Sequence, residues 1–152
     1  MILNGEPLEG VDCFQYLGSQ VAADGGCERD VVHRMNKGYR ACGALKSVLS
    51  NRGLGIKAKK CLYEELIIVP TALYGEEAWG MRRPERRKVN VLEMKCLRSL
   101  VVVSRMDRVR NEEVRRRAGI ERELASRTDQ RVLRWFGQVE RMDENIVWPE
   151  GC

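Results

Sequence analysis

The stretch that most constrains the fold runs from Leu62 to Trp79 (LYEELIIVPTALYGEEAW) and is the most apolar run in the chain. Four of its side chains recur at helical spacing and form one stripe, namely Leu62, Leu66, Val69 and Leu73. The run is apolar on its other sides too, so we expect the remaining segments to wrap around it. Pro70 removes a backbone donor, which predicts a kink or a break there. Glutamates interrupt the run, and it is too short to span a bilayer.

The charge of the chain is uneven. The 152 residues carry a formal net charge of +5. Residues 1–30 contain one arginine and six acidic residues, whereas residues 31–152 contain 26 basic and 16 acidic residues. A basic body of this kind is typical of proteins that bind a phosphate backbone, although a set of well-solvated helices would have the same composition.

Cysteine and histidine usage argues against a metal site. The six cysteines are scattered without a CxxC pair, and His33 is the only histidine. This pattern fits neither a zinc site nor the disulfide framework of a secreted domain. The first thirty residues are acidic and lack the apolar core of a signal peptide. We therefore expect an intracellular protein, in the nucleus or cytoplasm and not secreted.

The periodicity predicts a mainly α fold: a bundle of about four to five helices with a short N-terminal β-hairpin. The hairpin should occupy residues 1–22, with Asn4-Gly5 as its turn. Helices are expected over residues 28–50, from 56 through the central stretch, over 84–103, from a cap at Asn111 to Gly119, and over 121–142. The first of these should bury Val32, Met35, Tyr39, Cys42, Leu45 and Leu49. The last should have one face formed by Leu124, Thr128, Val132, Trp135, Phe136 and Val139.

Candidate binding residues come from basic clusters. The face of helix 28–50 opposite its apolar stripe is basic at one end and small at the other, which suits either a bulky ligand or helix–helix packing. Lys57, Lys59 and Lys60 oppose the dipole at a helix start, which points weakly to phosphate, and Lys57 and Lys60 are taken as candidates. Arg82 and Arg83 begin a series of arginine runs that could neutralise several phosphates without reading bases.

Several enzyme signatures are missing from the sequence. It contains no glycine-rich phosphate loop, no GxSxG, no HExxH and no close pair of aspartates for two-metal chemistry. We therefore expect no catalytic residues and no self-sufficient enzyme. Residues 111–142 also have the length of a helix–turn–helix with Gly119 at the turn, so sequence-specific DNA binding is an alternative. A third hypothesis is a structural domain whose arginines serve only to keep it soluble.

Six segments, in order, resemble the reverse transcriptases of non-LTR (LINE-type) retrotransposons. They are VDCFQYLGS at 11–19, DGGC at 24–27, LYEELIIVPTALYGEEAW at 62–79, LEMKCLR at 92–98, RVRNEEVRRRAG at 108–119 and RWFGQVERM at 134–142. The resemblance covers roughly residues 11–143. The sequence departs from the family pattern at Gln138, where histidine is usual, and at Glu140.

The resemblance implies which part of such an enzyme this chain corresponds to. Residues 1–22 would be a remnant of the palm near the primer grip, 23–104 a thumb-like helical domain, 105–143 a C-terminal helical extension and 144–152 a disordered tail. The catalytic palm, which binds two Mg²⁺ ions, would lie upstream, so no cofactor is expected here. The expected partners are the backbone of an RNA–DNA or DNA duplex and the palm and fingers domains, without a membrane.

The same resemblance, together with the basic clusters, gives the candidate residues. The nucleic-acid-binding candidates are Arg29, His33, Asn36, Lys37, Arg40, Ser47, Lys57, Lys60, Arg82 and Arg83. Tyr16, Leu17 and Gly18 would lie near the primer terminus of the parent enzyme, or would serve local packing.

Overall fold

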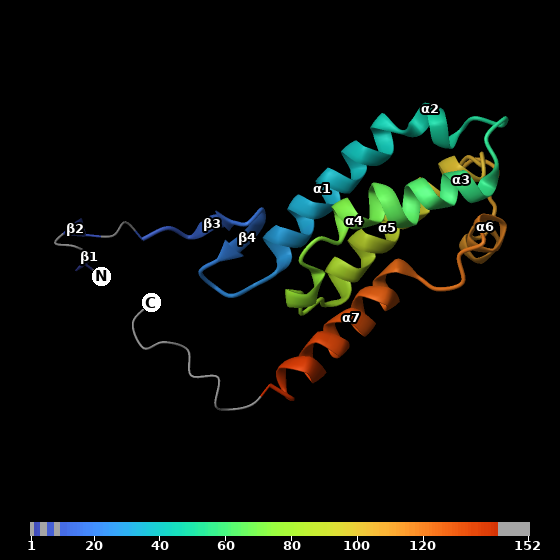
Figure 1. The fold of residues 1–152 in the computed structure, drawn as a ribbon. Helices are drawn as coiled ribbons and strands as arrows, with labels where there is room; N and C mark the ends of the chain where they lie inside the picture. The colour runs from blue at the N-terminus through green and yellow to red at the C-terminus, as the bar shows by residue number, and fades with distance from the viewer. Residues whose placement is uncertain (1, 4–5, 8–9, 143–152) are drawn as a thin grey trace.

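The N-terminal region forms two short antiparallel hairpins ahead of the helices. The computed structural model describes residues 2–3, 6–7 and 10–142 (Figure 1). Strand β1 (Ile2–Leu3) pairs with β2 (Glu6–Pro7), and β3 (Cys13–Tyr16) pairs with β4 (Ser19–Ala22). The predicted fold class, mainly α with a short N-terminal β-hairpin, is confirmed. The expected turn at Asn4-Gly5 lies outside the described residues, as does the expected tail at 144–152.

The second hairpin turns at two residues with positive φ. Leu17 has φ 45° and Gly18 has φ 85°, and β3 pairs with β4 in the register Tyr16 to Ser19. Positive φ at both central residues matches the twist of a tight two-residue hairpin. Leucine rarely adopts this conformation, so other contacts must hold the turn in place.

The helix predicted at residues 28–50 is present with one interruption. Helix α1 spans Glu28–Ala44, Leu45 ends it, and α2 continues over Lys46–Leu49. Met35, Cys42 and Leu49 are buried, as expected. Val32 is not: it is 37% exposed, and the neighbouring Val31 is fully buried in its place.

The central stretch is helical but changes its winding. Helix α3 (Ile56–Cys61) passes into a π-helical turn, η1 (Leu62–Leu66), then α4 (Ile68–Ala72) and a 3₁₀ turn, η2 (Glu76–Ala78). The predicted break occurs at Ile67, where φ is −130°. It precedes Pro70 by three residues, because the proline ring clashes with the turn before it.

The π-helical turn also changes which residues face the core. The predicted stripe is wrong at Leu66, which is 62% exposed. Tyr63 and Ile68 are each 1% exposed, while Val69 and Leu73 are buried as expected. The wider turn rotates the residues that follow, so a stripe drawn with constant helical spacing is out of phase across it.

Two further helices begin and end near their predicted limits. Helix α5 spans Arg83–Leu100, and the Glu85 carboxylate accepts a hydrogen bond from the Arg82 backbone N–H at 2.9 Å. Helix α6 spans Asn111–Ala118 and ends at Gly119, whose φ of 69° permits the turn. The predicted cap at Asn111 is wrong, because Arg110 occupies the cap position. The Asn111 side chain accepts a hydrogen bond from Arg98 instead.

The helices enclose one aliphatic core. Helix α1 lies against both α4 and α5, with α6 packed on α5 at one end (Figure 1). The core contains residues from both sides of the expected boundary at 104/105, including Val31, Leu92, Val114 and Leu124. The central stretch is therefore covered by neighbouring helices, as its composition predicts.

The last helix is only half covered. Helix α7 spans Leu124–Val139 and packs against α5 and η2 (Figure 1). Leu124 and Thr128 are buried, but Trp135 is 45% exposed and Phe136 is 55% exposed. The predicted apolar face therefore exists, and its C-terminal half has no cover among the described residues because the helix extends past the core.

Candidate nucleic-acid interface

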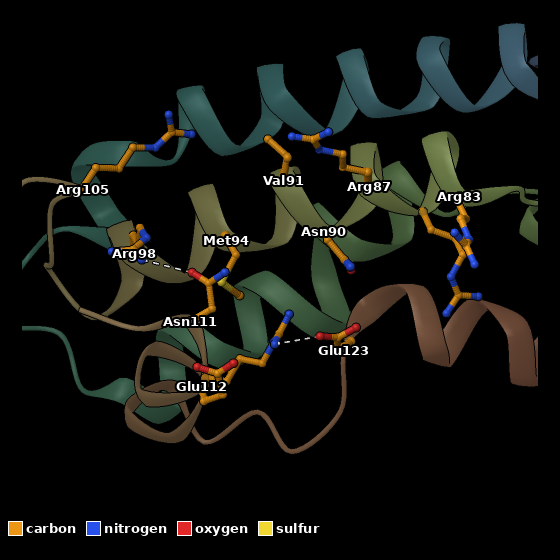
Figure 2. Close-up of a pocket in the computed structure, with 12 residues that line it drawn as sticks. Arg83, Arg87, Asn90, Val91, Met94, Arg98, Arg105, Asn111, Glu112 and Glu123 are labelled. Carbon is orange, nitrogen blue, oxygen red and sulfur yellow. Dashed lines mark hydrogen bonds and ion pairs between the residues drawn. The ribbon is translucent and has the colours of Figure 1, made fainter. Parts of the chain in front are cut away.

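A groove rich in arginine runs between α5 and the segment that contains α6 and the start of α7 (Figure 2). Its volume is about 640 Å³. Six arginines and two glutamates line it: Arg83, Arg86, Arg87, Arg98, Arg105, Arg115, Glu112 and Glu123. We call it the arginine groove. Six positive charges against two negative ones suit it to a polyanion.

One arginine at the floor of this groove belongs to a buried junction. Arg115 donates to the Glu93 carboxylate at 2.8 Å and pairs with Glu123 at 3.0 Å. The other Glu93 oxygen accepts from the Leu124 backbone N–H at 3.1 Å. Burial raises the pKa of Glu93, and the hydrogen bond from Arg115 opposes that rise. This carboxylate thus fastens α5, α6 and the start of α7 together.

Two more of the groove's arginines are occupied by the fold. Arg98 donates to the Val109 carbonyl oxygen at 2.7 Å and to Asn111 Oδ1 at 3.1 Å, which closes the loop after α5. Arg86 forms an ion pair with Asp129 of α7. These guanidinium groups hold elements together, so they are poorly placed to bind an external anion.

The remaining three arginines form the rim of the groove. Arg83, Arg87 and Arg105 are exposed, and within residues 10–142 none of them forms an ion pair. Figure 2 places Val91 between Arg87 and Arg105 along one edge. We call Arg83, Arg87 and Arg105 the rim arginines. Their charges are not offset by a paired carboxylate, so they are the ones that can neutralise phosphates.

A second groove lies on the other side of α5, against α1. It has a volume of about 660 Å³, and its lining is largely apolar. The apolar side chains are Val32, Met35, Tyr39, Pro84 and Val91, and the polar ones are Asn36, Arg83, Arg87 and Lys88. We call it the apolar groove. Arg83, Arg87 and Val91 line both grooves, so the two surfaces are continuous across α5.

Tyr39 of α1 lines the apolar groove and contacts a lysine of α5. The Lys95 ammonium is 4.7 Å from the centre of its ring. Burial raises the pKa of the Tyr39 phenol, and the positive charge of Arg105 opposes that rise. Arg105 is therefore electrostatically coupled to α1 as well as to the arginine groove.

The candidate residues of α1 and α2 differ in their exposure. The exposed ones are Arg29, Asn36, Arg40 and Ser47, and the half-buried ones are His33 and Lys37. Of these six, only Asn36 lines one of the two grooves. Arg83, from the other cluster of candidates, lines both. Arg82 lines a separate depression with Glu85.

The lysines at the start of α3 have an internal explanation. Lys60 donates to the Gly119 carbonyl oxygen at 2.7 Å, at the end of α6. Its buried neighbour Lys59 donates to the Leu100 carbonyl oxygen at 3.3 Å, at the end of α5. Lysine at a helix C-terminus satisfies free carbonyls and favours the dipole. Of these three lysines only Lys57 is exposed, so the prediction of a phosphate site at this helix start has little support.

The hairpin that carries Tyr16, Leu17 and Gly18 is anchored by a buried arginine. Arg34 of α1 donates to the Gly18 carbonyl oxygen at 2.7 Å and to Ser19 Oγ at 3.2 Å. Tyr16 and Leu17 themselves are exposed. The contact with Arg34 fixes the strained turn from its carbonyl side, while two large side chains project away from the core.

Sequence reasoning missed the group of residues that holds this hairpin. Asp30 accepts from the Gln20 backbone N–H and from Trp79 Nε1, both at 2.8 Å. The Arg34 guanidinium lies 4.4 Å from the centre of the Tyr74 ring. A signal existed, because Arg34 falls among the apolar positions of α1 and a charge there needs a buried partner.

Two broader observations concern the described residues alone. Between residues 10 and 142, together with 2–3 and 6–7, no group of three or more histidine, cysteine or acidic side chains is arranged to hold a metal ion. No helix in that same part of the chain is long and apolar enough to cross a membrane.

Comparisons with known proteins add nothing to this geometry. No protein-family model, no curated protein and no solved structure matches the chain.

Proposed function

We propose that this chain is a thumb-like helical segment of a non-LTR retrotransposon reverse transcriptase. On this proposal it holds the backbone of an RNA–DNA or DNA duplex without reading its sequence. It does not itself catalyse nucleotide addition, and the Mg²⁺ ions of the reaction belong to the palm of the parent enzyme. Phosphate contacts of this kind provide affinity and orientation but no sequence discrimination.

The observation that carries the proposal is the division of the arginines in one groove. Arg86, Arg98 and Arg115 are engaged by the fold, whereas the rim arginines are exposed and free of ion pairs within the described residues. Arg83 and Arg87 lie on one face of α5 because they are four residues apart. An exposed arginine without a carboxylate partner adds little to stability, so its placement beside other arginines favours a role in binding an anion.

The proposal is also supported by a tertiary contact between two of the segments that resemble the retrotransposon family. The YLGS segment and the LYGEEAW segment are more than fifty residues apart in sequence. Ser19 of the first lies 3.1 Å from the position that a Cβ on Gly75 of the second would occupy. Asp30 accepts hydrogen bonds from the backbone N–H of Gln20, the residue directly after the first segment, and from Trp79 Nε1 of the second. The two segments are therefore held against each other in the folded chain.

The helix–turn–helix alternative is less well supported. Such a motif reads DNA with the N-terminal residues of its second helix. In α7 those residues include Leu124 and Thr128, which are buried. Arg116 and Arg117 of α6 are paired with Glu113 within the same helix. The start of the second helix therefore offers few free side chains to base edges.

The proposal is tested by the affinity for a fluorescent RNA–DNA hybrid, measured by anisotropy at moderate salt. The test variant is Arg83→Glu/Arg87→Glu/Arg105→Glu, and the matched control is Arg52→Glu/Arg122→Glu/Arg134→Glu, which makes the same charge change at exposed sites outside both grooves. We expect the rim variant to lose at least tenfold more affinity than the control, because three phosphate contacts change sign.

Other outcomes separate the alternatives. Equal losses in the two variants would mean that only net charge matters and that the groove is no interface. Strong preference for one DNA site would favour the helix–turn–helix hypothesis. A lack of binding at moderate salt would favour the hypothesis of a structural domain. Incorporation of deoxynucleotides with Mg²⁺ would contradict the expectation that the chain lacks polymerase activity.

A further inference from the structure

We infer that the apolar groove between α1 and α5 binds unpaired nucleotides that adjoin the duplex held by the rim arginines. The inference rests on the proposed function and extends it, because it specifies the nucleic acid as a duplex with a single-stranded extension. It assigns to Val32, Tyr39, Val91 and Asn36 a contact with bases.

The chemistry of the groove fits an unpaired base. Its floor presents Val32, Met35, Tyr39, Pro84 and Val91. Val32 is 37% exposed and Val91 is 42% exposed, although both line a groove between two packed helices. A base has two apolar faces and a polar edge, and proteins bind single strands by pairing apolar or aromatic surface with a basic border. The volume of about 660 Å³ lies within the usual range for small-molecule sites.

The charges around the groove favour nucleic acid over a neutral apolar partner. Arg83, Arg87 and Lys88 border the apolar floor. Lys88 is engaged with Glu28 at 2.9 Å, but that pair is exposed and easily exchanged. Within the described part of the chain, no acidic side chain lines this groove, in contrast to the arginine groove with its two glutamates. The ligand should therefore combine flat apolar groups with closely spaced negative charges.

The continuity of the two grooves fixes how the ligand lies. Arg83 and Arg87 border both, with Val91 between the grooves on the same side of α5. A strand whose phosphates contact these arginines can pass from the arginine groove to the apolar groove across α5. Paired bases are stacked on each other and cannot enter an apolar groove, whereas unpaired bases can turn into it. Asn36 of α1 lines the apolar groove, where its amide can hydrogen-bond a base edge.

The test compares one blunt RNA–DNA hybrid with the same hybrid extended by a short single-stranded overhang. Affinity is measured by anisotropy, and a 2-aminopurine in the overhang reports stacking by loss of fluorescence. We expect the overhang to increase affinity about tenfold and to be quenched on binding. Val32→Ser changes a residue that lines only the apolar groove, so it should remove most of that increase while leaving affinity for the blunt hybrid unchanged. The matched control is Val48→Ser, at a valine that is also 37% exposed, and it should retain the increase.

The outcomes distinguish this inference from the function on which it rests. If blunt and extended hybrids bind equally well, the apolar groove has no role and the proposed duplex binding stands. If neither binds, the proposed function fails and this inference falls with it. If an acidic amphipathic peptide displaces the overhang at lower concentration than a single-stranded oligonucleotide does, the groove is a protein-docking site and the inference is wrong. Thermal unfolding of each variant checks that a loss of binding is not a loss of folding.

Discussion

Arg115 and Arg87 line the same groove, yet the environments of their guanidinium groups are opposite. The Arg115 side chain is 13% exposed and contacts two carboxylates. Arg87 is exposed and forms no ion pair among the described residues. The first arginine holds three helices together, and the second is available to a ligand. The count of arginines in the sequence therefore overstates the charge that can bind phosphate.

The largest expected effect comes from breaking the buried junction. Arg115→Met leaves the Glu93 carboxylate buried without its cation, which should lower the free energy of unfolding by about 3 kcal/mol. Urea denaturation measures this loss. Arg116→Met is the control, because that side chain is 74% exposed and its loss should cost less than about 0.5 kcal/mol. Similar losses in the two variants would show that Glu93 does not depend on Arg115.

A smaller effect is expected at the anchor of the hairpin. Arg34→Met removes the donor to the Gly18 carbonyl oxygen and should destabilise the hairpin by about 2 kcal/mol. Hydrogen exchange should then become faster at the paired amides of β3 and β4, while the amides in the middle of α5 keep their protection. Uniformly faster exchange throughout the chain would instead place Arg34 in the global core.

The pH dependence of stability should differ in sign between a buried glutamate, Glu93, and a half-buried one, Glu113. Burial raises the pKa of Glu93 above its ordinary value. The stabilisation that its neutral form gives to the folded state is therefore fully present below about pH 4.5, and it is lost as pH rises through the folded-state pKa. Comparison of wild type with Glu93→Gln across this range should therefore show wild type losing relative stability as pH rises.

Glu113 is the matched case with the opposite sign. Hydrogen bonds from Arg116 and Arg117 lower the pKa of Glu113 to about 2. The stabilisation that its ionised form gives to the folded state is present above the ordinary glutamate pKa, and it is lost as pH falls through the folded-state pKa. Wild type should accordingly gain stability relative to Glu113→Gln as pH rises from about 2 to 4.5. The same sign in both comparisons would contradict the assigned environments.

The smallest effect on stability is expected at the rim. Arg87→Ala should change the free energy of unfolding by less than about 0.5 kcal/mol, because this arginine forms no ion pair among the described residues. Thermal and urea unfolding provide the measurement. A loss above 1.4 kcal/mol, which is about tenfold in the folding equilibrium, would mean that the side chain serves the fold.

Much of the fold could be predicted because its signals are local. Pro84 with Glu85 marks the start of α5 and Gly119 marks the end of α6, and neither depends on distant residues. The π-helical turn could not be predicted, since it arises where the break before Pro70 is accommodated. It moved Leu66 from the predicted stripe to the surface.

The candidate site was less predictable because it depends on long-range pairing. Glu93 and Arg115 are 22 residues apart, and Arg86 and Asp129 are 43 apart. No local pattern indicates which arginines find carboxylates and which remain on the rim. Lys60 illustrates the same difficulty, since its partner is a backbone carbonyl 59 residues away.

The most direct test of the account is the salt dependence of hybrid binding by wild type and by Arg83→Glu/Arg87→Glu/Arg105→Glu. Each phosphate contact contributes about 0.9 to the slope of log affinity against log salt, so removing three should reduce the slope by about 2 to 3. The control Arg52→Glu/Arg122→Glu/Arg134→Glu should keep the slope of wild type. An unchanged slope in the rim variant would contradict the claim that these three arginines contact the phosphates.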